Sequence, residues 1–424
     1  MQLEFVEDIS KTEYEEFINS VPKSHFMQSY TFGKIRETKG FVAHHVGLKK
    51  GKDLICTALL LEKKLPFGYC YFYCPRGYVI DYSDKELLKE FSSCLKKYAK
   101  KKKAIFIKID PDIKRHTLDL DGNIIDGENN YLLMDYLTSL GYRHRGFNKA
   151  FENEQPRFTF RLDLDKEYSD VYSGFHSTLK KVLNKGNQYN ASLYKGDISD
   201  IGDFYITAKA TAEREGIVQP SIDYYRNFYK MFNDNGQSDL YVLKVNIPEL
   251  KKVFESKIND LENEIKSLSN KSGRNEEKRA NKINDLEGHL KKLNKDFSEV
   301  MAIDMEEVVL TSLITVKYKD KMWLVHGGNN SCLTCLNANY LAYSTAIKDA
   351  YDEGYKCVDF FGTCGDANPD KSNPIFGIHA FKKRFGGEYI EFIGEYDLVV
   401  NKFMYIVFIK CIPLYRKLIR KLKK

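Results

Sequence analysis

Residues 249 to 298 differ in composition from the chain on either side of them, and they restrict its fold more than any other segment. Apolar residues recur there at alternating spacings of three and four, which is typical of helices that pack along one stripe. The two runs are Ile258, Leu261, Ile265 and Leu268, and then Ile283, Leu286, Leu290, Leu293 and Phe297. Turn formers at 269 to 275 separate them. The segment therefore predicts an antiparallel helical hairpin whose arms, at about 20 residues each, extend roughly 30 Å.

The charges along this hairpin are compatible with two roles. Lysine and arginine residues are interspersed with glutamate and aspartate, as in a solvated coiled coil. The same cations also permit contact with a polyanion such as tRNA. Both interpretations stay open at this point.

Outside the hairpin, one order of elements occurs twice. The first copy has a β-hairpin pattern over 41 to 61, an aromatic strand at 69 to 73, a helix over about 83 to 102 and a strand at 104 to 109. The second copy has a β-hairpin over 308 to 326, a helix over about 336 to 352 and a strand at 357 to 361. Two copies of an α+β unit, the second interrupted by the helical hairpin, account for the length of 424 residues.

Composition and cysteine usage indicate a globular protein of a reducing compartment. The chain is 43% apolar, which is ample for sizeable cores, and it opens on a mixed, charged segment rather than a secretory signal. Nine cysteines are scattered without a disulfide framework, so we expect a cytoplasmic protein. Cys332-x-x-Cys335 lacks a second pair at zinc-ribbon spacing, and we therefore expect free thiols and no metal site there.

The C-terminal segment 402–424 combines an apolar run with many cations. The run at 403 to 409 is too short to span a bilayer. The cations that follow are Lys410, Arg416, Lys417, Arg420, Lys421, Lys423 and Lys424. Peripheral contact with an anionic inner membrane surface is one interpretation. A packed helix with a solvated basic face is the other.

The usual signatures of hydrolases, kinases, dinucleotide enzymes and zinc proteases are missing from the sequence. Transfer of a group from an already activated ester needs none of them. It needs positioning, a path for the amine proton and a cation near the developing oxyanion. Acidic and small residues at 110 to 112 and 362 to 366 follow predicted strands, and the basic run 382 to 384 lies between two phenylalanines. These segments are the candidates for such chemistry.

Several segments, taken in order, resemble the FemABX family of non-ribosomal peptidyltransferases. They are Phe26-Met27-Gln28-Ser29, Pro75-Arg76-Gly77, Phe106 to Pro111, Gln155 to Thr159, Thr211 to Arg214, Asp359-Phe360-Phe361-Gly362 and Gly377 to Lys382. The resemblance covers essentially the whole chain. It implies two tandem acetyltransferase-like (GNAT) domains: 1-155, completed by about 389-424, and 156-388 with the arm 249-298 inserted. Tyr78 departs from the pattern, because a second proline is common there.

The resemblance also implies roles for individual residues. Lys382, which follows Phe381, is expected to stabilise the negative oxygen of a tetrahedral intermediate. Asp110 and Asp112 are candidates for receiving the amine proton or orienting the acceptor amine. The residues expected to bind substrate, several through its diphosphate, are Lys34, Arg76, Arg214 and Phe381. Contacts with tRNA or phosphate are assigned to Lys180, Lys181 and Lys185.

The expected function is aminoacyl-tRNA-dependent transfer of an amino acid to the stem-peptide amine of a lipid-linked or UDP-linked peptidoglycan precursor, which builds the interpeptide bridge. No cofactor is expected, because the tRNA ester already carries the activation. Two alternatives belong to other classes. One is a non-catalytic scaffold that uses the helical arm, and the other is a conventional acyl-CoA N-acetyltransferase, although the pyrophosphate loop of that class is missing.

Overall fold

The computed structural model describes residues 3–22, 24–149, 154–216, 218–270 and 275–411, and the chain divides into two compact units. Unit 1 contains Met1–Asp163, Lys317–Lys321 and Asp359–Lys424, and unit 2 contains Leu164–Val316 and Met322–Val358. The predicted domain limits at 155 and 388 stay predictions, because these units group residues by packing alone.

Unit 1 is built on a mixed sheet with the strand order β1-β2-β3-β4-β5-β16-β8. These strands are β1 (Leu3–Val6), β2 (Val42–Lys50), β3 (Asp53–Lys64), β4 (Cys70–Cys74), β5 (Ala104–Ile109), β8 (Tyr142–His144) and β16 (Tyr396–Val399). The pair β4 and β5 is parallel, and the helix α3 (Lys85–Lys101) connects the two strands. Since parallel strands end at the same edge, Pro75 and Asp110 follow neighbouring strand ends.

The connecting helix α3 forms because its sequence supplies an N-cap and an apolar face at helical spacing. The side chain of Asp84 caps it by accepting from the backbone N–H of Leu87. The buried residues of α3 recur at helical spacing, and they are Leu88, Phe91, Ser92, Leu95, Tyr98 and Ala99. All of them except Ser92 join the hydrophobic core of unit 1 against β3, β4 and β5.

A second group of strands in unit 1 follows the order β14-β9-β15-β6-β7. It consists of the residues of β14 (Cys357–Thr363) from Asp359 onward, with β9 (Phe158–Asp163), β15 (Glu388–Phe392), β6 (Lys114–Leu118) and β7 (Ile124–Asn129). The helices of unit 1 besides α3 are α1 (Lys11–Ser20), α2 (Tyr30–Glu37), α4 (Tyr131–Ser139), α12 (Phe376–Lys383) and α13 (Lys402–Ile406). Short helical turns are η1 (Phe26–Gln28), η2 (Pro66–Gly68) and η5 (Val407–Cys411).

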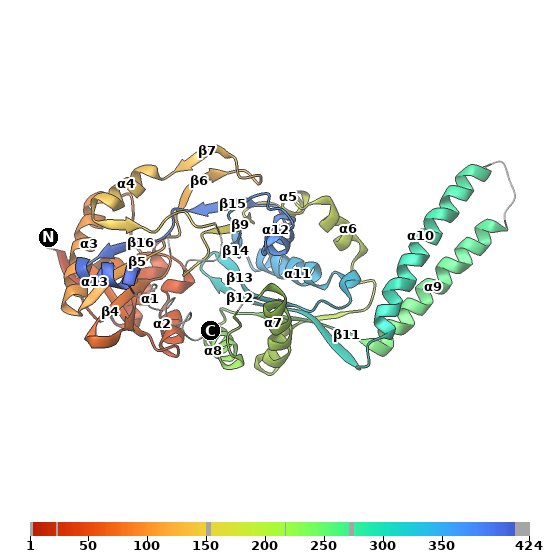
Figure 1. Cartoon of the computed structure of the whole chain (residues 1–424), viewed down its shortest axis with the longest axis horizontal. Helices are drawn as coiled ribbons and strands as arrows, with labels where there is room; N and C mark the ends of the chain where they lie inside the picture. The colour runs from red at the N-terminus through yellow and green to blue at the C-terminus, as the bar shows by residue number, and fades with distance from the viewer. Residues whose placement is uncertain (1–2, 23, 150–153, 217, 271–274, 412–424) are drawn as a thin grey trace. The chain divides into compact units, whose positions relative to one another are not determined.

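Unit 2 contains the strand order β10-β11-β12-β13. These strands are β10 (Ser192–Gly196), β11 (Leu240–Asn246), β12 (Glu307–Tyr318) and β13 (Lys321–Asn329). Its helices are α5 (Tyr168–Ser173), α6 (Ser177–Lys185), α7 (Ile201–Glu215), α8 (Ile222–Asn233), α9 (Ile247–Ser269), α10 (Glu276–Met301) and α11 (Ala338–Asp352), and its turns are η3 (Ile198–Asp200) and η4 (Thr334–Leu336). Every helix and strand that the repeated order predicts is present, and most of the helices and strands are labelled in Figure 1.

The helical arm has the predicted antiparallel form, with α9 and α10 side by side (Figure 1). Lys282 and Glu264 form an ion pair across it at 2.7 Å. At its base, Phe254 is fully buried and its ring stacks on Tyr189 and Phe297, with centroid distances of 5.1 and 5.7 Å. The arm is therefore fixed to unit 2 through an aromatic core at its base rather than through its charges.

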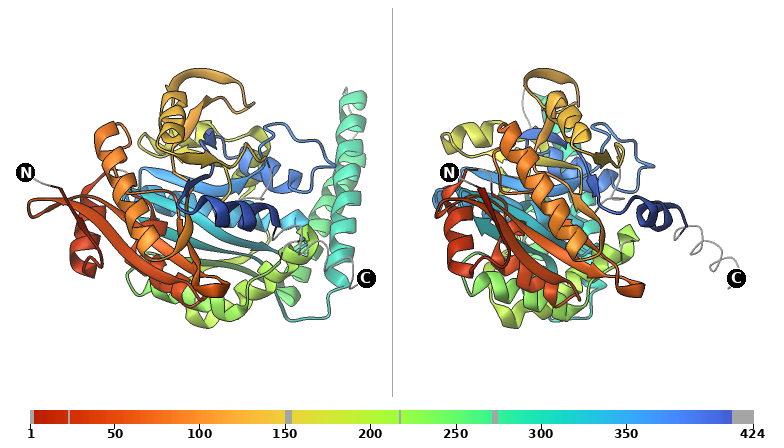
Figure 2. Two further views of the ribbon diagram at one scale, coloured as in Figure 1. Left: turned by 60° about the vertical axis from the view of Figure 1, so that its left-hand side comes forward. Right: turned by 90° about the vertical axis from the view of Figure 1, so that its left-hand side faces the viewer.

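The C-terminal segment is packed where the structure describes it. Tyr405 of α13 is buried, and its hydroxyl donates to Asp397 at 2.7 Å. Figure 2 shows α13 and η5 in dark blue near the end of the described chain. The cations from Arg416 onward lie outside the described residues. Among the helices in the described ranges, none is both long and apolar enough to cross a bilayer.

We predict that Phe254→Ala loosens the base of the arm. Loss of a fully buried ring is expected to lower the free energy of unfolding of unit 2 by about 3 to 5 kcal/mol. Leu268→Ala, at a half-buried position far along the arm, is the matched control and should have a smaller effect. Urea unfolding measures both changes, and equal effects would contradict anchoring at the base.

Candidate active site

Three of the sequence motifs meet in unit 1 where β4 and β5 end. The side-chain amide of Gln28 donates to the Pro75 carbonyl at 2.6 Å, and its oxygen accepts from the Leu59 N–H at 2.9 Å. The Asp110 carboxylate accepts from the Arg76 N–H at 2.6 Å and from the Tyr73 hydroxyl at 2.9 Å. All of these bonds are buried, so they hold the turn at Pro75 and Arg76 from two sides.

The turn itself has an unusual backbone. Arg76 and Gly77 have φ values of 58° and 78°, in the left-handed region. A Cβ on Gly77 would lie 2.5 Å from the Tyr82 hydroxyl and 3.0 Å from Cα of Pro111, so only glycine fits. Tyr78, which replaces the common proline, donates its N–H to the Tyr82 hydroxyl at 2.8 Å. A proline there would lack that donor.

Two guanidinium groups lie against one aromatic ring beside this turn. The Arg76 guanidinium carbon is 4.7 Å from the centroid of the Phe392 ring, and that of Arg161 is 5.2 Å away. Arg76 also donates to the carbonyl of Pro156 at 3.3 Å. The Arg76 side chain is thus restrained and nearly buried, and a small cavity lies against it.

Arg161 bridges two carboxylates that are far apart in the sequence. One terminal nitrogen donates to Asp112 at 2.6 Å, and Nε donates to Asp359 at 2.8 Å. All three side chains are mostly shielded from water, so the pairing is little screened. The bridge ties the loop after β5 to strands β9 and β14.

Lys382 is connected to the same network through the backbone at the end of β14. Its ammonium donates to the carbonyls of Gly362 and Phe361, at 2.6 and 3.2 Å. Asp359 accepts from the Phe361 N–H at 2.8 Å and from the Thr159 hydroxyl at 2.7 Å. Phe361 has a φ of 59°, which is rare for a bulky residue, and these bonds hold it there.

Burial and neighbouring charges shift the pKa of each candidate catalytic group. Burial raises the pKa of Asp110 to about 7, against the opposing charge of Arg76. Burial lowers the pKa of Lys382 to about 8, against the charge of Asp359. Burial alone would raise the pKa of Asp112, but the nearby cations, Arg161 foremost, hold it well below its usual range. The site thus contains a carboxylate that stays ionised and two groups that titrate near neutral pH.

A small cavity of about 10 Å³ lies against Arg76, Asp110 and Phe392, and its other lining residues are Gln155, Pro156, Arg157, Gly394 and Glu395. Its volume suits about one water molecule. Asp110 therefore borders a narrow space beside the Arg76 side chain that is large enough for one water molecule. Among the residues that the structure describes, no cluster of histidine, cysteine, aspartate and glutamate is arranged to hold a metal ion.

Two other predicted substrate-binding residues lie elsewhere in unit 1. Lys34 of α2 is exposed, pairs with Glu37 at 3.0 Å and lies 5.6 Å over the Tyr30 ring. Phe381 immediately precedes Lys382, and its ring contacts that of Phe385 at 5.3 Å. The structure therefore places Lys382, Asp112, Asp110 and Arg76 in one connected network. Phe381 is adjacent to this network in sequence, whereas Lys34 pairs with Glu37 on its own helix.

The remaining predicted binding residues belong to unit 2. Arg214 of α7 donates to the Asn329 carbonyl at 3.2 Å and pairs with Glu215. Lys180, Lys181 and Lys185 follow one another on α6, and Lys180 donates to the Ser173 carbonyl. Their predicted roles stay predictions.

Lys185 lines a cavity of about 270 Å³ at the base of the arm. Lys292, His289 and Tyr189 line it as well, and the other residues around it are Val182, Gly186, Gln188, Leu293, Asp296, Cys335, Leu336 and Asn337. Cys332 and Cys335 are both free thiols. The cavity brings cations of α6 and of the arm to one place, which the sequence did not predict.

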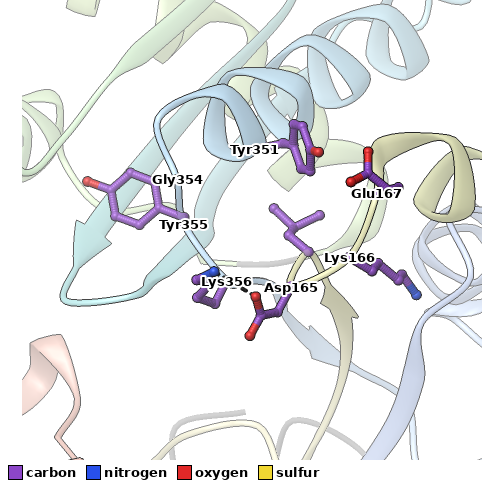
Figure 3. Close-up of a pocket in the computed structure, with 8 residues that line it drawn as sticks. Asp165, Lys166, Glu167, Tyr351, Gly354, Tyr355 and Lys356 are labelled. Carbon is purple, nitrogen blue, oxygen red and sulfur yellow. Dashed lines mark hydrogen bonds and ion pairs between the residues drawn. The ribbon is translucent and has the colours of Figure 1, made fainter.

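A larger hollow of about 360 Å³ lies where α11 meets the following strand (Figure 3). Lys356 pairs there with Asp165 at 2.6 Å, and Tyr351 and Glu167 stand on the opposite wall (Figure 3). Its charges are of both signs and largely exposed, so it offers no concentrated charge for an anionic substrate. It contains none of the predicted site residues.

Sequence reasoning missed Arg161, Thr159 and Phe392 as members of the site. A signal for the first two was present in β9 and the residue before it, where Arg157, Thr159 and Arg161 alternate with three apolar residues. An alternating strand usually turns its polar face to water, yet Arg157 and Thr159 are almost fully buried. Buried polar positions on a strand are therefore the feature that marks this network. Phe392 had no such signal.

The family model described as the FemAB family matches residues 9–412. The lipid II:glycine glycyltransferase of Staphylococcus haemolyticus is 28% identical over 411 residues, which cover 94% of this chain and 93% of that protein. The enzyme of the same name from Staphylococcus aureus is 27% identical over 406 residues, with the same coverage. The crystal structure of FemX superposes with a TM-score of 0.73 at 26% identity and covers 96% of this chain and 99% of that one. The predicted fold class is thereby confirmed.

We predict that Arg161→Met destabilises unit 1 in a pH-dependent way. It leaves Asp112 and Asp359 without their shared cation, which is expected to cost about 3 kcal/mol near neutral pH. The depressed pKa of Asp112 contributes stability above about pH 4, and wild type loses this contribution as pH falls further. The difference between the proteins should therefore shrink in acid.

Urea unfolding at several pH values measures this difference. Lys383→Met removes a cation whose partner Asp121 is largely exposed, so it should cost less than about 1 kcal/mol. A constant difference between wild type and Arg161→Met across the acid range would contradict the bridge.

Proposed function

Because the chain belongs to the FemAB family, we propose that it transfers an amino acid from aminoacyl-tRNA to the stem-peptide amine of a peptidoglycan precursor. The acceptor is lipid II or its UDP-linked form, and the product is part of the interpeptide bridge. The names of the relatives support the acceptor, since lipid II:glycine glycyltransferases align with 94% of this chain. The observation that carries the proposal is the network that joins Lys382 to Asp112 in unit 1.

In the proposed reaction, the acceptor amine attacks the ester carbonyl of the aminoacyl-tRNA. A C–N bond forms, and the carbonyl oxygen becomes an oxyanion in the tetrahedral intermediate. Lys382 already donates to two backbone carbonyls, so its ammonium is fixed and one of its three N–H groups is left for this oxyanion. The ester C–O bond then breaks, and the tRNA ribose oxygen takes up the proton that the amine has lost.

The two aspartates suit different parts of this proton transfer. Asp110, with its pKa near 7, is matched to accept a proton and release it again at neutral pH. Asp112 stays ionised beside Arg161, so its carboxylate suits acceptance of a hydrogen bond from the acceptor amine, which orients the amine. We assign proton transfer to Asp110 and amine orientation to Asp112.

The cations outside the network suit the phosphates of the two substrates. Lys34 and Arg214 are proposed to bind the diphosphate of the precursor. Arg76, which belongs to the network, is proposed to contact the substrate from there. Lys180, Lys181 and Lys185 are proposed to bind the tRNA backbone. The cavity that Lys185 shares with Lys292 and His289 supports this assignment, because several donors for phosphate oxygens surround one space.

If the acceptor is lipid-linked, the transfer takes place at a membrane. We propose a cytoplasmic enzyme that binds the inner membrane surface peripherally through 402–424. The described part of this segment packs on unit 1 through Tyr405, so a truncation after residue 402 would damage the core. Neutral substitutions of the cations from Arg416 onward are the cleaner test of that contact.

We predict that Lys382→Ala lowers the rate of transfer from a charged tRNA pool to lipid II by at least about a hundredfold. The same change should leave binding of the precursor nearly unaltered, since the oxyanion exists only in the transition state. Lys383→Ala is the neighbouring control. Unchanged transfer by Lys382→Ala would point instead to the scaffold alternative.

We predict a bell-shaped dependence of the transfer rate on pH. The rate should rise through about pH 7 as Asp110 loses its proton, and fall above about pH 8 as Lys382 loses its charge. In Lys382→Arg the alkaline fall should disappear, because a guanidinium stays charged. In Asp110→Asn the acid limb should disappear at a much lower rate. Unaltered limbs in either variant would contradict the assignment.

A further inference from the structure

One aromatic side chain in unit 1 projects into solvent from a strained turn. Phe67, in the η2 turn between β3 and β4, is 94% exposed. Its φ of 63° lies in the left-handed region, which is strained for a bulky residue. A glycine at this position would remove both the strain and the exposed ring. Neither folding nor the proposed catalytic network explains the phenylalanine.

Lysines surround this turn on both sides. Lys64 ends β3 and is paired with Cys70, the first residue of β4. Cys70 also donates its N–H to the Lys103 carbonyl and its thiol to the Lys102 carbonyl, each at 3.4 Å. The exposed Lys102 and Lys103 therefore lie next to the other side of the same hairpin. The segments 63 to 69 and 98 to 105 contain no acidic residue.

The C-terminal helix adds further apolar surface at the same cluster. One face of α13 and η5 packs with the residues that flank Phe67, namely Leu65 and Tyr69, in a shared hydrophobic cluster. The opposite face leaves Phe403 and Ile406 exposed, at 73% and 49%. The cations of that face are Lys402 and Lys410. Figure 1 shows α13 beside β5, to which β4 is the parallel neighbour.

We propose that these residues form a binding surface for an anionic lipid bilayer, with Phe67 inserted among the lipid headgroups. This Phe67 surface consists of Phe67, Phe403 and Ile406, with Lys64, Lys102, Lys103, Lys402 and Lys410 around them. The inference rests on the proposed function in one respect, namely that the acceptor is lipid-linked. The inference goes beyond the proposed function by assigning membrane contact to a hairpin turn far in sequence from the basic C-terminus.

The composition of the surface favours lipid over a protein partner. Its apolar side chains project singly and are accompanied by exposed lysines, which complements a layer of anionic headgroups above hydrocarbon. A protein partner would instead need a concave or extended apolar face to bury its contacts. Insertion of one phenylalanine is expected to strengthen partitioning at least about tenfold.

The test is binding of the full chain to vesicles by cosedimentation. Vesicles of phosphatidylcholine with anionic phosphatidylglycerol are compared with vesicles of phosphatidylcholine alone. Phe67→Gly should lower partitioning to the anionic vesicles at least about tenfold. It should leave thermal stability equal or higher, because glycine relieves the backbone strain. Val218→Gly removes another exposed apolar side chain, in unit 2, and should not alter partitioning.

Transfer assays separate this inference from the proposed function. Phe67→Gly should transfer normally to the UDP-linked precursor and poorly to lipid II in vesicles. Equal partitioning of wild type and Phe67→Gly, or a change in oligomeric state instead of partitioning, would overturn the Phe67 surface even if transfer persists. Vesicle binding that depends on Phe67 without transfer to either precursor would retain the surface and overturn the proposed function.

Discussion

The contact on which the site depends is the double ion pair of Arg161. One planar guanidinium holds Asp112 from the loop after β5 and Asp359 from β14, and it lies against Phe392 of β15. A lysine ammonium is a compact charge without the planar set of donors that lets arginine bind two carboxylates at once. Asp359 in turn fixes the backbone of Phe361, and the Phe361 carbonyl accepts from Lys382. The position of Lys382, the proposed oxyanion donor, thus depends on the ion pair between Arg161 and Asp359, which Lys382 does not itself join.

Burying such a network is costly unless every charge has a partner, and the same burial gives the site its chemistry. A water-exposed lysine and aspartate would be fully charged at neutral pH. Burial moves the pKa of Lys382 down and that of Asp110 up, so that both lie near neutral pH, while the Arg161 guanidinium keeps Asp112 ionised. An acceptor amine needs both kinds of group, one to hold it and one to take its proton. The left-handed backbone at Arg76 and Phe361 is held in place by the same hydrogen bonds.

The helices and strands of the repeated order and of the arm were accessible from the sequence because each depends on local periodicity. The arm follows from apolar spacing, and α3 follows from its cap and its buried face. Lys382, Asp110 and Arg76 were chosen as candidates through ordered motifs that resemble those of a family. Arg161 was not, because its partners lie 49 and 198 positions away and only strand packing brings them together. The cavity joining Lys185 to Lys292 was hidden for the same reason. Phe67 was hidden because exposure depends on tertiary structure.

The most direct test of the transferase account is mass spectrometry of the acceptor itself. Lipid II is incubated with the enzyme and a charged bacterial tRNA pool, and the stem peptide is then fragmented. We expect a precursor whose side-chain amine carries an added amino acid, and the mass of that residue identifies the donor. An unmodified stem peptide, with the tRNA esters still intact and the UDP-linked precursor unmodified as well, would contradict it.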